Sequence, residues 1–206
     1  MTTRPRFLTE CDRIVRYLAI VGGYGFFVLS LLVAFEVVAR KLFSFSLQGV
    51  DEIGGYVMAG AVALGLSYAL VHRAHTRIDV FVEKLPSGLR PAVHVLAQVA
   101  LAGFAAFMAW RAEFTLSESL DYQSVASTPL QTPLWIPQLV WTAGLAVFAF
   151  LAGATAIHAV ILLARRPDQV AVHYGPRTVR EELNDEMKAI GTPAGRAGDG
   201  SQRMLP

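Results

Sequence analysis

Four long runs without Asp, Glu, Lys or Arg dominate the hydrophobic pattern of the chain. They extend over Tyr17 to Phe35, Ile53 to Val71, Ala92 to Trp110 and Trp135 to Ala164. Each of the first three contains 19 residues, and a helix of that length covers about 28 Å, close to the ~30 Å hydrocarbon core of a bilayer. The pattern therefore predicts transmembrane helices over about 14–40, 52–71, 92–112 and 135–164.

All Asp, Glu, Lys and Arg residues lie in the segments outside these runs. Hydrophobic residues make up 54% of the chain and charged residues only 17%, a balance that excludes an ordinary soluble domain. We therefore predict an all-α membrane protein with a four-helix transmembrane domain over 14–164. An N-terminal tail covers 1–13, and a C-terminal tail covers 165–206.

The second run carries charged residues at both ends. Asp51 and Glu52 stand at its start, where the exposed N–H groups and the positive pole of the helix dipole favour negative charge. A basic cluster follows its end, made up of His72, Arg73, His75 and Arg77. Within the run, small residues recur every fourth position at Ala61, Gly65 and Ala69. This spacing lets helix backbones approach closely in lipid and predicts packing against protein.

Two further short helices are predicted outside the spans. In the second loop, apolar residues spaced i, i+3, i+4 and i+7 predict an amphipathic helix on the membrane surface, with Thr76 and Asp79 as its start signal and Pro86 at its end. Asp79 then has either a capping or a functional role. In the C-terminal tail a stripe of apolar residues predicts a helix over about 178–190, followed by disorder.

The basic residues predict the orientation. Of the 18 Lys and Arg, four lie before the first apolar run, two between the first and second runs, four between the second and third, one between the third and fourth, and seven after the fourth. Cytoplasmic segments carry the excess of Lys and Arg in membrane proteins. Both termini and the second loop are therefore predicted to be cytoplasmic, and the first and third loops outside.

The sequence offers little catalytic or binding chemistry. No acidic or basic residue lies in the middle of the four spans, where carriers hold ions and substrates. Glu36 and Arg40, spaced i,i+4, fall near the outer interface, where we expect a structural role. No phosphate-binding glycine loop or nucleophile–base pair appears, so an enzyme is not indicated, and nucleic acid is not an expected partner. Cys11 is the single cysteine of the sequence, so an intrachain disulfide is excluded.

The histidines leave one alternative open. Paired histidines on neighbouring helices can ligate haem, and His94 and His158 are predicted to lie toward the same side of the membrane. A haem-binding membrane-anchor subunit, similar to a cytochrome b of a respiratory complex, is therefore the alternative reading. His72 and His75, in contrast, lie among basic residues at the interface.

Taken in order, several motifs resemble the small membrane subunit of tripartite ATP-independent periplasmic (TRAP) transporters. The first are Arg40 at the end of helix one and the Asp51–Glu52 pair that opens helix two. The run ALVHRAHTRIDV, with Arg73, His75 and Asp79, is followed by Leu85-Pro86 and, at helix four, by PLWIP. The resemblance covers about residues 14–164. One departure is Gln48-Gly49-Val50, where the family commonly has an aromatic residue.

This resemblance implies a function and a set of partners. A periplasmic binding protein captures a substrate, usually an organic acid, and a large membrane subunit imports it with sodium. The small subunit, in the inner membrane of a bacterium or archaeon, holds no cofactor and no transport site and acts as a scaffold. Because the chain ends soon after helix four, we expect the large subunit to be a separate polypeptide. The candidate partner-interface residues are Glu36, Arg40, Asp51, Glu52, Ala61, Gly65, Ala69, Arg73, His75 and Asp79.

Overall fold

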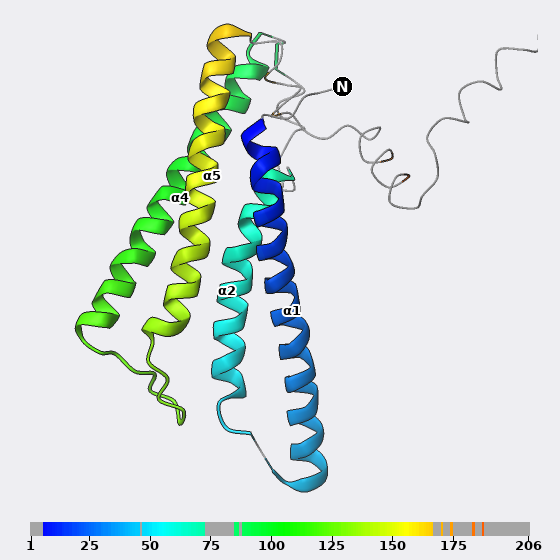
Figure 1. The fold of residues 1–206 in the computed structure, drawn as a ribbon, viewed down its shortest axis with the longest axis vertical. Helices are drawn as coiled ribbons and strands as arrows, with labels where there is room; N and C mark the ends of the chain where they lie inside the picture. Colours follow the sequence, from blue (N-terminus) through cyan, green and yellow to red (C-terminus); the bar gives the residue numbers. More distant parts are fainter. Residues whose placement is uncertain are drawn as a thin grey trace, which may run out of the picture. The chain divides into compact units, whose positions relative to one another are not determined.

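The computed structural model describes residues 6–45, 47–72, 85–86 and 88–166, together with the single residues 170, 174, 183 and 187. The chain divides into two compact units, residues 1–174 and residues 175–206. The helices of the first unit are α1 (Arg6–Phe43), α2 (Val50–Val71), α4 (Arg90–Asp121) and α5 (Trp135–Arg165) (Figure 1). All four are long and apolar enough to cross a membrane, and the described residues contain no β-strand. The predicted all-α membrane fold is confirmed.

Two helices are longer than their hydrophobic runs. The prediction began the first span near residue 14 and ended the third near 112, whereas α1 begins at Arg6 and α4 continues to Asp121. Hydropathy detects only the part of a helix that favours lipid. A helix continues into a polar environment until its backbone is redirected, and residues 113–121 contain neither Gly nor Pro.

The end of α4 is set by backbone geometry. Gln123 adopts a left-handed conformation with φ of 48°, and the N–H of Ser124 donates to the carbonyl of Ser119 at 3.0 Å. The N–H of Gln123 donates to the carbonyl of Leu120 at 3.3 Å. These are the two hydrogen bonds of a Schellman motif, which closes a helix C-terminus. Glycine usually occupies the left-handed position, so glutamine gave no such signal in the sequence.

The helices pack in a spatial order that differs from their order in the chain. Among the described helices, α1 packs on α2, α2 packs on α5, and α5 packs on α4. Two helical hairpins, α1–α2 and α4–α5, are therefore joined through the α2–α5 contact (Figure 1). As a result, α2 and α5 are the inner helices, and α1 and α4 are the outer ones.

Small residues bring α2 close to both of its neighbours. A methyl group on Gly22 of α1 would lie 3.2 Å from the backbone oxygen of Ala61 on α2. On the other side, a methyl group on Gly144 of α5 would lie 2.9 Å from the carbonyl carbon of Ala63. In lipid, where apolar surface gains little from leaving the solvent, such close van der Waals contact holds helices together.

Buried side chains link the helices into one core. Its largest cluster gathers residues from all four helices: Val15, Leu70, Val71, Ala105, Phe148, Leu151 and Ala152. A polar contact joins the α4–α5 pair, because Gln98 Nε2 donates to Thr155 Oγ1 at 2.7 Å and both side chains are buried. Interhelical hydrogen bonds of this kind contribute about 0.6 kcal/mol on average in membrane proteins.

The two predicted short helices lie outside the described residues. The surface helix near 76–85 falls almost entirely within the undescribed segment 73–84. Of the C-terminal helix near 178–190, only Leu183 and Met187 are described. Both helices therefore stay predictions.

The α2–α5 crossing makes Gly144 sensitive to substitution. We expect Gly144→Ala to lower the free energy of unfolding by about 1–3 kcal/mol, because the added methyl group overlaps the backbone of α2. Unfolding of the purified protein in mixed detergent micelles measures this change. The matched control is Gly153→Ala on the same helix, where a methyl group would meet nothing within 4 Å. Equal effects of the two substitutions would contradict the close crossing.

Candidate functional site: the loop end of the helices

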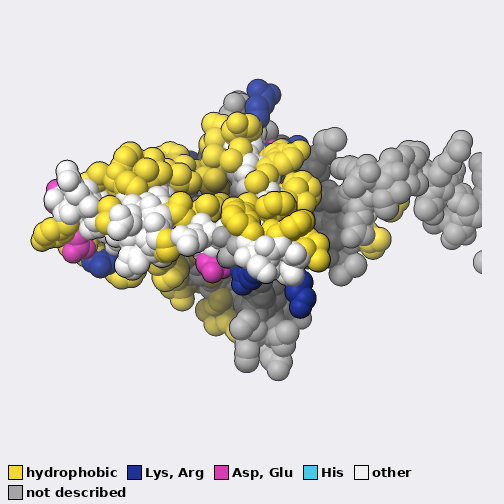
Figure 2. Space-filling view, turned by 90° about the horizontal axis from the view of Figure 1, so that it is seen from below, with side chains coloured by type: hydrophobic (Ala, Val, Ile, Leu, Met, Phe, Trp, Pro, Cys, Tyr) yellow, Lys and Arg dark blue, Asp and Glu magenta, His cyan; other side chains and the backbone are white. Residues whose placement is uncertain are grey.

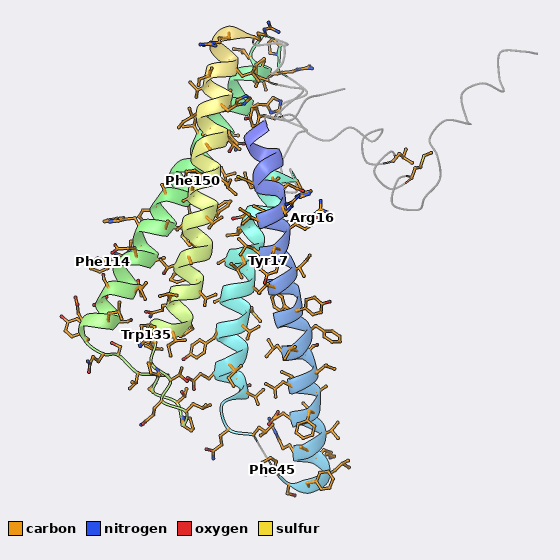
Figure 3. All side chains as sticks on the ribbon, in the orientation of Figure 1. Arg16, Tyr17, Phe45, Phe114, Trp135 and Phe150 are labelled. Carbon is orange, nitrogen blue, oxygen red and sulfur yellow. The ribbon has the colours of Figure 1, made fainter. Side chains whose placement is uncertain are left out.

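Two connections lie at one end of the four helices. The α1–α2 connection covers residues 44–49, and the α4–α5 loop covers residues 122–134. We call this the loop end; Phe45 and Trp135 lie toward it, and Arg16 lies toward the opposite, terminal end of the helices (Figure 3). Viewed onto the loop end, most described side chains are hydrophobic or uncharged, with few acidic and basic groups (Figure 2).

The α4–α5 loop has a defined hairpin-like structure without being a strand pair. Val125 and Pro133 form an isolated antiparallel bridge. The N–H of Ala126 donates to the carbonyl of Thr132 at 3.0 Å, and the N–H of Leu134 donates to the carbonyl of Ser124 at 3.0 Å. These bonds bring the two arms of the loop together, so that its tip is formed by residues 127–131.

Glu52 connects this loop to α2. Its Oε1 accepts a hydrogen bond from the hydroxyl of Tyr56, one turn further along α2, at 2.9 Å. Its Oε2 accepts a hydrogen bond from the hydroxyl of Thr128 at the loop tip. Because hydrogen bonds to a carboxylate are about twice as strong as those between neutral groups, this side chain is an effective link between the two hairpins.

A close packing contact between Gly49 and Leu130 accompanies the hydrogen bond between Glu52 and Thr128. Gly49 precedes α2 with φ of +90°, a conformation that favours glycine. A methyl group on Gly49 would lie 1.4 Å from Cδ1 of Leu130, so Leu130 occupies the space that any other residue would fill. The departure noted at Gln48-Gly49-Val50 therefore has a structural consequence: Gly49 lets the loop tip rest directly on the start of α2.

The predicted pair of Glu36 and Arg40 forms at the same end of the molecule. Arg40 Nε lies 3.0 Å from Glu36 Oε1, and Nη2 contacts the same oxygen. The Glu36 side chain is 5% exposed and that of Arg40 61%. A pocket of about 300 Å³ adjoins the pair and is also lined by Asp51 and Glu52. The structure thus brings together four candidate residues from two helices.

The small residues of α2 do not share one environment. Ala61 is buried inside the chain against Gly22, whereas Gly65 and Ala69 are half-buried, and a methyl group on Gly65 would meet nothing within 4 Å. An apolar groove of about 300 Å³ lies over α2 between α1 and α5. Its lining includes Val21, Gly25, Val57, Leu64, Ile136 and Val140.

The terminal end carries a second group of polar contacts. Arg16 Nη2 lies 3.0 Å from Asp12 Oδ2 within α1. His72 Nε2 lies 3.4 Å from Asp12 Oδ1 and links the end of α2 to α1. The His72 ring also stacks on Tyr68, with 4.0 Å between ring centroids. The remaining candidates, Arg73, His75 and Asp79, lie outside the described residues.

The structure describes the surroundings of both histidines that the haem alternative would use as ligands. His94 on α4 is buried. His158 Nδ1 lies 2.7 Å from the hydroxyl of Tyr174, which is buried with Val95 and Ala159 in a cluster at the terminal end. Over the described ranges no group of three His, Cys, Asp or Glu side chains is arranged to hold a metal ion.

The comparison with protein families decides the class. The family model for the DctQ component of tripartite ATP-independent periplasmic transporters matches residues 29–162. The chain belongs to this family. As a DctQ component it is a multi-pass protein of the cytoplasmic membrane and part of a multi-subunit transporter. The family gives the haem alternative no support, and neither a curated protein nor a solved structure matches the chain.

The DctQ match covers most of the site. It begins in the middle of α1 and ends near the end of α5, so it includes Glu36, Arg40, Asp51 and Glu52. Sequence reasoning missed Thr128 and Leu130, which no local pattern marks. The one available signal was Gly49 directly before a helix start, where glycine indicates an unusual backbone conformation or a close contact.

The buried Glu36 makes Arg40 important for stability. We expect Arg40→Ala to lower the free energy of unfolding by about 1–3 kcal/mol, because a buried carboxylate loses its cation. Chemical unfolding in detergent measures the change. Arg16→Ala is the control, since Arg16 also pairs i,i+4 on α1 but with the more exposed Asp12 (24% against 5%), and such pairs contribute about 0–1 kcal/mol. Arg40→Ala behaving like the control would refute the structural role of the pair.

Proposed function

We propose that this DctQ component is the non-catalytic scaffold of a sodium-driven importer of an organic acid. A periplasmic binding protein delivers the substrate, and the large membrane subunit binds it together with sodium and carries it across the membrane. The present chain braces the large subunit and presents its loop end to the binding protein. The family match is the observation that carries this proposal, since it identifies the transporter class.

The described helices support a scaffold rather than a carrier. Carriers hold ions and substrates near the bilayer midplane, at intramembrane charges or at interrupted helices. The middles of the four spans contain no Asp, Glu, Lys or Arg, and α1, α2, α4 and α5 run as continuous α-helices. The buried acid Glu36 lies toward the loop end of α1, beside its pairing partner Arg40.

The outer helices offer apolar surface to lipid and to the large subunit. On α1, Tyr17, Tyr24 and Phe27 are exposed on the isolated chain, and on α4 Phe104 and Phe107 are exposed. Large apolar surface of this kind is typical of a membrane or protein contact. The small residues Gly65 and Ala69 add a place where another backbone could approach closely.

The charge distribution supports the placement of the loop end on the periplasmic side. The two connections at this end carry few basic residues, whereas the tails and the second loop carry most of them. A binding protein in the periplasm would then meet the α4–α5 loop and the start of α2.

Cysteine labelling tests this orientation. In a background with Cys11→Ser, we expect a cysteine at Ser127 in the α4–α5 loop to react with an impermeant thiol reagent added to intact cells. A cysteine at Gly88, just before α4, should react only after the membrane is opened. Both positions are exposed and outside the helices. The reverse labelling pattern would place the loop end in the cytoplasm.

Reconstitution tests the scaffold role. Liposomes that contain this chain alone should not accumulate an organic acid under a sodium gradient, even with the binding protein present. Uptake should appear when the large subunit is included, and omission of this chain from the complete system should abolish or strongly impair it. The substrate for this assay is chosen by testing which organic acids of a panel the co-purifying binding protein binds. Sodium-driven uptake by the chain alone would overturn the proposal.

A further inference from the structure

Glu52 and Asp51 are neighbours in the sequence but have different environments. The Glu52 carboxylate uses one oxygen within α2, toward Tyr56, and the other across to Thr128, which is 76 residues away in the chain. Asp51 is exposed at the surface of the same helical turn and lines the adjoining pocket. Only Glu52 of this pair therefore reaches the α4–α5 loop.

We propose that Glu52 is a positioning residue that fixes the α4–α5 loop on the start of α2, so that the loop end offers the binding protein one preformed surface. This inference rests on the proposed function, in which the binding protein docks at the loop end. Glu52 itself acts through the loop and need not touch the partner. Glu52 was one of the candidate residues expected to contact a partner; the proposal gives it an indirect role instead.

The geometry of the loop explains why it needs such an anchor. Its hydrogen bonds between the arms, from Ala126 to Thr132 and from Leu134 to Ser124, set its hairpin form. They do not set the position of the tip relative to α2. That position depends on the hydrogen bonds of Thr128 and Thr132 to Glu52 and on the contact of Leu130 with Gly49, all of which join the loop to the start of α2.

Anchoring of this kind affects binding through preorganisation. Ordering a residue costs conformational entropy, and a loop that is already ordered does not incur this cost when a partner binds. Loss of the Glu52–Thr128 bond would transfer part of the cost to the docking step. The affinity for the binding protein should then fall, while steps after docking stay unchanged.

The same reasoning predicts that assembly with the large subunit is unaffected. The contacts that hold the hairpins together in the membrane are made elsewhere, by Gly22 against Ala61 and by Gly144 against Ala63. A loosened loop leaves these crossings in place. Replacement of Glu52 should therefore weaken docking of the binding protein without weakening assembly with the large subunit.

Uptake by the complete complex in proteoliposomes, titrated with substrate-loaded binding protein, tests the proposal. We expect Glu52→Gln to raise the half-saturating concentration of binding protein by about 5- to 10-fold, because the amide oxygen of Gln is a weaker hydrogen-bond acceptor than the carboxylate. The maximal rate and co-purification of the large subunit should be unchanged. The control Glu118→Gln makes the same chemical change at an exposed residue of α4 and should leave the half-saturating concentration within about twofold.

Thr128→Val provides a second, independent variant. It removes the hydroxyl donor and keeps the shape of the side chain, so it should raise the half-saturating concentration as Glu52→Gln does. Because Glu52→Gln already weakens the bond that Thr128→Val removes, the double variant should be no worse than Glu52→Gln alone. Additive effects, or a lower maximal rate at an unchanged half-saturating concentration, would overturn the positioning role.

A distance measurement on the same complex reports on the loop directly. Spin labels at Ser127 in the loop and at Met58 on α2, both exposed, should give a narrow distance distribution in the parent and in Glu118→Gln, and a broader one in Glu52→Gln and Thr128→Val. Unchanged distributions would refute the anchor. If uptake never depends on this chain, the proposed function fails. If uptake depends on it but Glu52→Gln behaves like Glu118→Gln, only this inference fails.

Discussion

The close approach of α2 to both α1 and α5 is the contact on which the rest of the structure depends. In a bilayer, two apolar helices gain little by hiding surface from lipid, so van der Waals contact between backbones has to hold them together. Gly22 against Ala61 and Gly144 against Ala63 provide that contact on the two sides of α2. Because the hairpins meet through α2 and α5, these crossings also fix where the connections lie.

The loop end is a consequence of that packing. Once α2 and α5 are side by side, the first turn of α2 lies beside the α4–α5 loop, and Glu52 can reach Thr128. The glycine before α2 then allows Leu130 to rest on its backbone. The loop end is thus built from both hairpins, and it is the surface to which we propose that the binding protein docks. This arrangement is consistent with a DctQ component that assists a separate carrier.

The charged residues show how the same residue types acquire different roles. Asp51 and Glu52 both stand in the first turn of α2, where the helix dipole favours acids. Only Glu52 points toward the second hairpin, because adjacent residues on a helix face about 100° apart. Glu36 was expected to pair with Arg40, and it does; it is also buried and lines a pocket together with Leu47, Gln48 and Thr128 of the loop end.

The sequence by itself determined the four spans, the i,i+4 pair on α1 and, through ordered motifs, the family. These follow from local properties: the transfer of each residue into lipid and spacing along one helix. Only the tertiary structure decided the spatial order of α1, α2, α5 and α4, the burial of Ala61 and the contact between Glu52 and Thr128. The physical reason is that spanning helices are apolar on every face, so hydrophobic periodicity does not indicate which face meets which neighbour.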